Sequence, residues 1–154
     1  MKIQDMNNES EGWRPTRAEL SDFLRDQPLC AFSSVNAEGN PQGATVAFSE
    51  TQDGDFIVGT SESSRKAANI DTNPNVALTI TDVERRYTVQ LEGIARKLGA
   101  EAFAGYADYH YEQLPASRPF KDAPGQVHIL ISPIHVRFSD CNPHPWVTTE
   151  YLAE

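Results

Sequence analysis

The sequence has few cysteines, few basic residues and no long apolar run, and each shortage excludes a class of protein. Its two cysteines, Cys30 and Cys141, lie far apart without metal-ligand spacing, so we expect free thiols in a reducing cytoplasm. Thirteen Lys and Arg against twenty-two Asp and Glu give a net charge of −9, which disfavours nucleic acid and anionic membranes as partners. No apolar stretch approaches the roughly 20 residues of a membrane-spanning helix. The polar start, residues 1–11, lacks the apolar region of a signal peptide.

The composition is that of one globular domain. The chain has 154 residues, of which 39% are hydrophobic and 23% are charged, so we expect a single domain over residues 1–154. We expect residues 1–13 to form a flexible arm. Prolines interrupt the segment 142–146, so residues 140–154 are expected to form an irregular tail.

Helices are predicted in three places. Thr16 and Glu19 have the spacing of a capping box, and the apolar stripe Leu20, Phe23 and Leu24 follows, so a helix begins at Thr16 and ends before Pro28. The other two helices are predicted over residues 65–71 and 99–113. The segment 114–125 holds three prolines and is predicted to be a loop.

Short strands account for most of the remaining chain. Alternating patterns and turn residues predict strands at 29–35, 44–49, 56–59, 76–81, 87–95, 127–131 and 134–138. The first three are joined by short turns, which indicates an antiparallel meander. The helices fall before, between and after these strands. The pattern favours an antiparallel barrel, with a capped sandwich as the alternative.

The segment 59–70 carries the most chemical information. It leads from a strand end through hydroxyl residues into a helix whose first turn holds Arg65 and Lys66. Cations are unfavourable there, because the helix dipole already places positive charge at that end. A bound anion would resolve the conflict, and hydroxyls, free N–H groups and two cations together favour a phosphate. The alternative is a solvated helix start whose cations pair with Glu62 or Asp71.

Over residues 29–98 the chain resembles the pyridoxamine 5′-phosphate oxidase-like family of flavin-binding split barrels. The motifs that carry the resemblance are Thr60, Ser64–Ala67, Asn73-Pro74 and Val89–Ala95, in this order and spacing. The resemblance implies a mainly β fold with peripheral helices, a six-stranded antiparallel split β-barrel. It also implies a homodimer that binds FMN in each of two clefts between the subunits.

The resemblance also implies roles for particular residues. The FMN phosphate would be held by Thr60, Ser64, Arg65 and Lys66. The isoalloxazine edge would lie along Thr45, Val46 and Ala47. The partner's flavin would be reached by Thr88 or Gln90. Trp146 either covers the flavin cleft by stacking or fills an apolar gap.

Three departures separate this chain from the vitamin B6 oxidases of that family. Those enzymes carry an arginine where this sequence has Ala44. They carry a second arginine in the helix where this sequence has Tyr106, Tyr109, His110 and Tyr111 but no matching arginine. Their C-terminal Arg-Leu-x-Pro motif is also missing. We therefore expect an FMN-dependent oxidoreductase acting on another small molecule, with no catalytic residue identified. The alternatives are a non-catalytic flavin- or haem-binding protein of storage or stress response, and an F420-dependent reductase.

The four histidines lack the spacing of a zinc site, so no metal is expected. If the cofactor were haem, His110 or His144 would be the candidate axial ligand.

Overall fold

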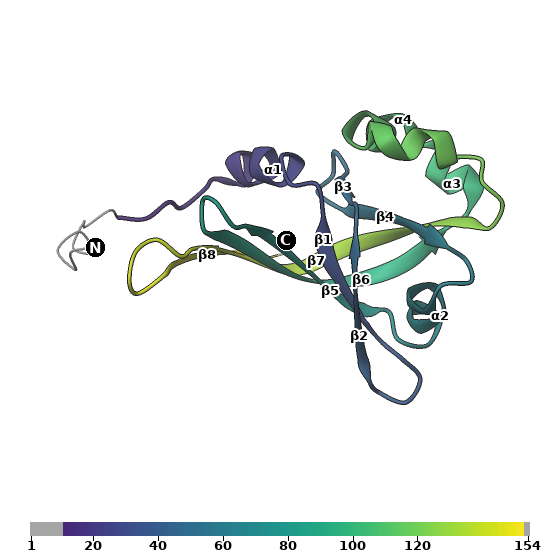
Figure 1. Cartoon of the computed structure of the whole chain (residues 1–154), viewed down its shortest axis with the longest axis horizontal. Helices are drawn as coiled ribbons and strands as arrows, with labels where there is room; N and C mark the ends of the chain where they lie inside the picture. The colour runs from purple at the N-terminus through teal and green to yellow at the C-terminus, as the bar shows by residue number, and fades with distance from the viewer. Residues whose placement is uncertain (1–10, 153–154) are drawn as a thin grey trace.

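The computed structural model describes residues 11–152, whose eight strands form one antiparallel sheet (Figure 1). The order across the sheet is β2-β1-β5-β6-β7-β4-β3, and β8 pairs with β7. The strand bounds are β1 Cys30–Val35, β2 Pro41–Val46, β3 Ser49–Glu50, β4 Phe56–Ser61, β5 Asn75–Asp82, β6 Tyr87–Leu98, β7 Gln126–Asp140 and β8 Val147–Leu152. The expected mainly β, antiparallel fold is confirmed, but the sheet has eight strands and not the six that the resemblance implied.

A two-residue connection forces this sheet to curl. Strands β2 and β3 lie at opposite ends of the sheet order, yet only Ala47 and Phe48 separate Val46 from Ser49. Three Cα steps of about 3.8 Å span at most about 11 Å. The two ends of the sheet must therefore approach each other, and the sheet becomes a half-barrel.

The concave face of the half-barrel holds the main core. Alternation along β5 buries Val76, Leu78 and Ile80, as the pattern predicts. Helix α1 (Arg17–Arg25) adds the predicted stripe of Leu20, Phe23 and Leu24. Burying one such side chain contributes roughly 1.5–3 kcal/mol, so these six are a large part of the fold's stability.

Two of the predicted helices form as expected. The capping box of α1 is present, because the Thr16 hydroxyl accepts from the Glu19 N–H and the Glu19 carboxylate accepts from the Thr16 N–H. Helix α2 (Arg65–Thr72) follows β4 and packs against β1 and β6. Both helices place their apolar positions against the sheet.

The predicted helix at 99–113 is divided into two. Helix α3 (Ala100–Ala104) ends at Gly105, and α4 (Ala107–Gln113) starts after Tyr106. Glycine disfavours the helix interior, which explains the break. The 3₁₀ helix η2 (Pro115–Phe120) lies within the segment predicted to be a loop.

Three strand predictions are corrected by long-range pairing. The predicted strand 44–49 falls on β2 and the separate β3. Among residues 11–152, β2 pairs only with β1, so the first three predicted strands form no meander. The two strands predicted at the end are one long β7. Pro133 lies at a register shift opposite Gly93, a bulge where the missing N–H is tolerated. A Cβ on Gly93 would lie 2.7 Å from the Ile131 side chain, so the bulge requires glycine.

The predicted irregular tail is wrong over residues 147–152. Residues 147–152 form β8, which pairs in register with residues 135–140 of β7. Pro143 and Pro145 fall in the turn before β8, so they leave its hydrogen bonds intact.

The predicted flexible arm covers residues 1–13, of which 1–10 lie outside the described residues. Trp13 is anchored: its backbone N–H donates to Asp140 Oδ2 at 2.8 Å, and its ring packs against Phe23, Tyr87 and Phe138. The prediction is therefore wrong at Trp13, because a distant part of the chain supplies its contacts.

None of the helices between residues 11 and 152 is long and apolar enough to cross a membrane.

Asp140 joins the two ends of the described chain. Its carboxylate is buried and accepts from the Trp13 N–H and from both the backbone and side-chain N–H of Asn142. Burial by itself would raise the pKa of Asp140, but these hydrogen bonds outweigh it and hold the pKa below its ordinary value.

We predict that Asp140→Ala lowers the free energy of unfolding by about 1.5–3 kcal/mol, because it removes hydrogen bonds to a charged acceptor. Urea unfolding at pH 7 measures this. Glu38→Ala, in an exposed turn, is the matched control and should be neutral. Equal stabilities of Asp140→Ala and wild type would contradict the anchoring role.

Candidate functional site

The start of helix α2 forms a cluster of hydroxyl and basic side chains. Ser64 caps the helix by accepting from the Ala67 N–H at 3.2 Å, and Thr60 at the end of β4 donates to Ser64 Oγ at 3.0 Å. Lys66 Nζ donates to Thr60 Oγ1 at 3.3 Å. The four phosphate residues expected from the sequence include these three, and Arg65 adjoins them. We call Thr60, Ser64, Arg65 and Lys66 the cradle.

The two cations of the cradle have no acidic partner within residues 11–152. The alternative interpretation paired them with Glu62 or Asp71. Asp71 instead binds Lys97 at 2.8 Å, at the other end of α2, and the first turn of α2 holds no acidic residue. The conflict between two cations and the helix dipole is therefore left for another anion to resolve.

A cavity of about 90 Å³ lies between the two cations and the first hairpin of the sheet. Its walls are Arg65 and Lys66 on one side and residues of β1 and β2, among them Ser34, Gln42 and Ala44, on the other. The backbone N–H groups of a helix start, two cations and a small cavity are what a phosphate monoester requires.

Asn69 fixes the position of this cavity, and the sequence analysis missed it. Its side chain is buried and donates at 2.9 Å to both Ser34 Oγ and Gln42 Oε1, which are paired across β1 and β2. The signal was available, because Asn69 is a polar residue on the buried face of α2 between Ala67 and Ile70. A buried polar side chain at such a position needs hydrogen-bond partners.

The residues expected along the flavin ring continue from this cavity. Within residues 11–152, β2 pairs only with β1, so its other edge has free N–H and C=O groups. Val46 lies on the same face of β2 as Ala44, Thr45 lies on the opposite face, and Ala47 is in the link to β3. The cradle and the free edge of β2 thus adjoin through Ala44.

Thr88 and Gln90 are not brought to the cradle of their own chain. They lie on β6, on the convex face of the sheet, where directly paired residues form a row: Thr45, Ala31, Thr79, Gln90, Arg137 and Glu150. Gln90 is three strands from Thr45, about 14 Å at about 4.8 Å per strand. Any role for Gln90 at a flavin would be toward another subunit.

Trp146 is also distant from the cradle. It lies in the turn before β8, is 60% exposed, and adjoins Val147, which pairs with Asp140. Thr60 pairs with Val127, thirteen residues away along β7, on the order of 40 Å of strand. Figure 1 shows the β7–β8 turn and α2 at opposite ends of the molecule. Within one chain, Trp146 therefore neither stacks on this site nor fills a buried gap.

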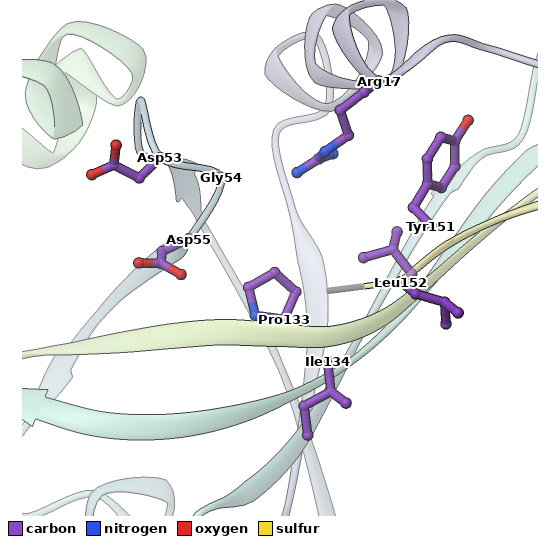
Figure 2. A pocket seen from close by; sticks show the side chains of 9 residues that line it. Arg17, Asp53, Gly54, Asp55, Pro133, Ile134, Tyr151 and Leu152 are labelled. Atoms are coloured by element: carbon purple, nitrogen blue, oxygen red, sulfur yellow. The ribbon is translucent and has the colours of Figure 1, made fainter. Parts of the chain in front are cut away.

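A second, wider cavity of about 530 Å³ opens where β4 and β8 meet end to end along β7 (Figure 2). None of the ten site residues expected from the sequence lines it. Its cation, Arg17, binds buried Glu50 at 3.2 Å, and Asp53 and Asp55 add negative charge. An anionic phosphate is therefore disfavoured in this cavity.

Comparison with known proteins identifies the family. The sequence model described as pyridoxamine 5′-phosphate oxidase matches residues 16–139. The chain belongs to this family. A pyridoxine/pyridoxamine 5′-phosphate oxidase of Bacteroides fragilis is 32% identical over 108 residues, which are 70% of this chain and 43% of that enzyme. The chain thus spans less than half the length of this relative.

Solved structures of low identity share the fold. A haem-binding protein of Mycobacterium smegmatis superposes with a TM-score of 0.73 at 16% identity, covering 91% of this chain and 59% of that one. A pyridoxamine 5′-phosphate oxidase-related, FMN-binding protein of Nostoc punctiforme gives 0.70 at 13%, covering 92% and 93%. An F420 reductase gives 0.57 at 18%, covering 75% and 94%. Proteins named for haem, FMN and F420 therefore share this fold.

The histidines do not gather at the cradle. His110 is buried and shares a 2.6 Å hydrogen bond through Nδ1 with Ser49 Oγ. His128 is buried beside it, His135 pairs with Glu150 at 3.6 Å, and His144 is exposed. Within residues 11–152 no three His, Cys, Asp or Glu side chains form a metal-binding group.

Ser49 and His110 are arranged like a nucleophile and its general base, but His110 is too weakly basic for that role. Burial, together with neighbouring His128, lowers the pKa of His110 to about 4. A base this weak activates a serine poorly at neutral pH. We assign the pair a structural role in joining α4 to β3.

We predict that His110 makes the free energy of unfolding depend on pH. The folded pKa is about 4 against 6.5 for a free histidine, so below pH 6.5 the unfolded chain binds the proton more readily. Stability therefore falls as the pH drops from about 6.5 towards 4. The loss between pH 7 and pH 5 is on the order of 1–2 kcal/mol.

Urea unfolding of wild type, His110→Phe and His144→Gln at both pH values measures this loss. His110→Phe should lose less stability than wild type between pH 7 and 5, and the exposed-site variant His144→Gln should lose as much. Identical losses in wild type and His110→Phe would exclude His110 as the source.

Proposed function

We propose that this chain binds FMN by its phosphate at the cradle and acts as an FMN-dependent oxidoreductase on a small organic substrate. The observation that carries the proposal is the pair Arg65 and Lys66, which has no acidic partner within residues 11–152 and stands at an acid-free helix start. A phosphate monoester supplies the missing negative charge and accepts from the helix N–H groups.

Each cradle residue has a defined part in holding the phosphate. Lys66 and Arg65 neutralise its charge, and Arg65 can bind it through two N–H groups. Ser64 Oγ already accepts from Ala67 N–H and from Thr60, so its own hydroxyl proton is available for the phosphate. The free edge of β2 offers backbone groups at Thr45, Val46 and Ala47 to the ring. The bound flavin would supply the redox chemistry, accepting and returning hydride equivalents.

FMN fits this site better than the two alternative cofactors. F420 carries a longer acidic tail and would require cations beyond Arg65 and Lys66, the two that line the 90 Å³ cavity. Haem would require an imidazole, and no described histidine lines that cavity. The visible spectrum after addition of FMN, F420 or haemin separates the three: a two-banded flavin spectrum supports the proposal, and a Soret band opposes it.

The substrate that we propose is not pyridoxine 5′-phosphate, although the curated relatives are named for it. Ala44 lies at the cavity where the vitamin B6 oxidases have an arginine. Tyr106, Tyr109 and His110 line a separate cavity of about 230 Å³ that contains no arginine or lysine. The FMN phosphate would occupy Arg65 and Lys66, so a second phosphate would find no further cation among the residues that line either cavity.

Cys30 and Cys141 are free thiols, which supports a cytoplasmic location.

Removing one cradle cation tests the proposal directly. A hydrogen bond to a charged group contributes roughly 1.5–3 kcal/mol. We predict that Lys66→Ala or Arg65→Ala weakens FMN binding about ten- to a hundredfold, because 1.4 kcal/mol corresponds to tenfold. Riboflavin lacks the phosphate, so its affinity should be unchanged. Fluorescence quenching titrations with both ligands provide the measurement.

Lys97→Ala is the matched control, since it removes the same charge at the other end of α2, where Lys97 binds Asp71. It should leave FMN affinity within about twofold. Equal weakening of FMN and riboflavin, or unchanged FMN affinity in both cradle variants, would place the phosphate elsewhere.

We further propose that the functional unit is a homodimer formed through the convex face of the sheet. The first four positions of the row of paired residues on this face, Thr45, Ala31, Thr79 and Gln90, are uncharged. Exposed Ile94 lies four residues beyond Gln90 on β6. A neighbouring subunit on this face would bring its own Gln90 or Thr88 toward the free edge of β2.

Sedimentation equilibrium of the FMN-loaded protein should therefore give about 34 kDa, twice the 17.1 kDa of one chain. Thr79→Arg places a charged side chain in the middle of the row and should shift the protein to 17 kDa with weaker FMN binding. Ala37→Arg, in the exposed β1–β2 turn, should remain a dimer. A wild-type monomer at saturating FMN would refute the proposed dimer.

A further inference from the structure

A third cavity, separate from the cradle, lies between the helices α3 and α4 and the sheet. It has a volume of about 400 Å³ and is lined by Phe103, Tyr111, Gln126, His128 and the rim residues Lys121 and Asp122. Neighbouring residues of β4 face opposite sides of the sheet, so Thr60 belongs to the cradle and Gly59 to this cavity. We call it the α3–α4 cavity.

Two buried polar side chains line this cavity without a hydrogen-bond partner among residues 11–152. His128 is 6% exposed and Tyr111 is 3% exposed, and neither ring forms a hydrogen bond to the described protein. The Tyr111 hydroxyl and the His128 ring nitrogens are not fully enclosed by protein atoms, so they are open to the cavity. His110, in the same cluster, does have a partner in Ser49. Buried polar groups in folded proteins nearly always have partners, so these two groups take theirs from whatever occupies the cavity.

The imidazole of His128 is held firmly in place. It stacks on Phe103 with ring centroids 3.5 Å apart and planes within 3° of parallel. Gly59 lies next to it, because a Cβ there would lie 3.6 Å from the imidazole and 2.8 Å from Gln126 Nε2. Gly59 therefore leaves room for both side chains, and the stacked imidazole lines the cavity in a fixed orientation.

The rim of the cavity carries charges of both signs. Lys121 and Asp122 line it, and the Arg118 guanidinium, which lies over the Tyr111 ring at 5.7 Å, adds a second cation near Tyr111. Burial lowers the pKa of His128, so at neutral pH the imidazole is uncharged, with one N–H donor and one acceptor nitrogen.

We infer that the α3–α4 cavity binds a small planar aromatic carboxylate. The aromatic ring would pack against Phe103 and Leu98 in the apolar part of the cavity. The carboxylate would accept from the Tyr111 hydroxyl and the His128 N–H, with Lys121 supplying the charge. This site goes beyond the proposed flavin function, and neither site needs the other to be correct.

Benzoate is the probe, titrated into the full-length protein with and without FMN. Calorimetry measures its affinity, and long-range ¹H–¹⁵N spectra follow the ring nitrogens of each histidine. We expect benzoate to shift the His128 nitrogens and to bind at least tenfold more tightly than benzyl alcohol, which has the same ring and no charge. Benzylamine, a cation of the same size, should not bind.

Shape-preserving variants locate the site. Tyr111→Phe and His128→Phe each remove one polar group and keep the ring, so each should weaken benzoate about two- to tenfold. Tyr109→Phe is the matched control: it lies on the same helix but lines the 230 Å³ cavity on the other side, and it should leave the affinity unchanged. Thermal unfolding checks that each variant is folded, and Tyr111→Phe stands as the test if His128→Phe is not.

Three results would overturn the inference. They are no shift of the His128 nitrogens at 10 mM benzoate, unchanged affinity in both Tyr111→Phe and His128→Phe, and weakening by Tyr109→Phe equal to that by Tyr111→Phe. The first would mean that water alone satisfies the two polar groups, and the last would move the ligand to the other cavity.

Discussion

The two-residue link Ala47-Phe48 is the constraint on which the rest of the structure depends. It joins the strands at the two ends of the sheet order, so an eight-stranded sheet has to curl until its ends lie within about 11 Å. The curl encloses the apolar residues of β1, β5, β6 and β7 and leaves one edge of β2 without a partner strand in the described chain. An enclosed core and a free edge thus arise from the same short connection.

Helix α2 both packs on the curled sheet and places the two cations of the cradle. Its buried face, with Ala67 and Ile70, packs on the sheet, while Asn69 joins it to both strands of the first hairpin. Its first turn then places Arg65 and Lys66 beside Ala44 of β2. The helix that stabilises the end of the half-barrel is therefore also the one that presents the cations, and two positive charges at its positive end have an electrostatic cost.

Strand β4 separates two environments by simple alternation. Thr60 faces the cradle, with its hydroxyl bonded to Ser64 and Lys66, and neighbouring Gly59 faces the α3–α4 cavity, where the side chains of Gln126 and His128 pass over it. A second connection runs through the backbone, because Glu62 N–H donates to Gly125 O at 2.7 Å. The loop that borders the α3–α4 cavity is thereby attached to the loop that precedes α2.

Features that depend on residues close in sequence were predictable from the sequence alone. The capping box of Thr16 and Glu19, the buried alternation of Val76, Leu78 and Ile80, and the helix start with Arg65 and Lys66 all follow from periodicity over a few residues. The family could also be recognised from motifs in this stretch, and the match over residues 16–139 confirms it.

Features that depend on distant partners were decided only by the tertiary structure. The sequence offered Asp71 as a partner for the cradle cations, and the fold gives it to Lys97. The prolines before residue 147 indicated an irregular tail, but β7 had an unpaired edge that β8 occupies. The same holds for four other residues. Trp13 and Asn69 form hydrogen bonds to residues tens of positions away, and Tyr111 and His128 line a cavity. Local propensity is an energy between near neighbours, whereas strand pairing, burial and the choice of ion-pair partner are settled by which surfaces the chain must enclose together.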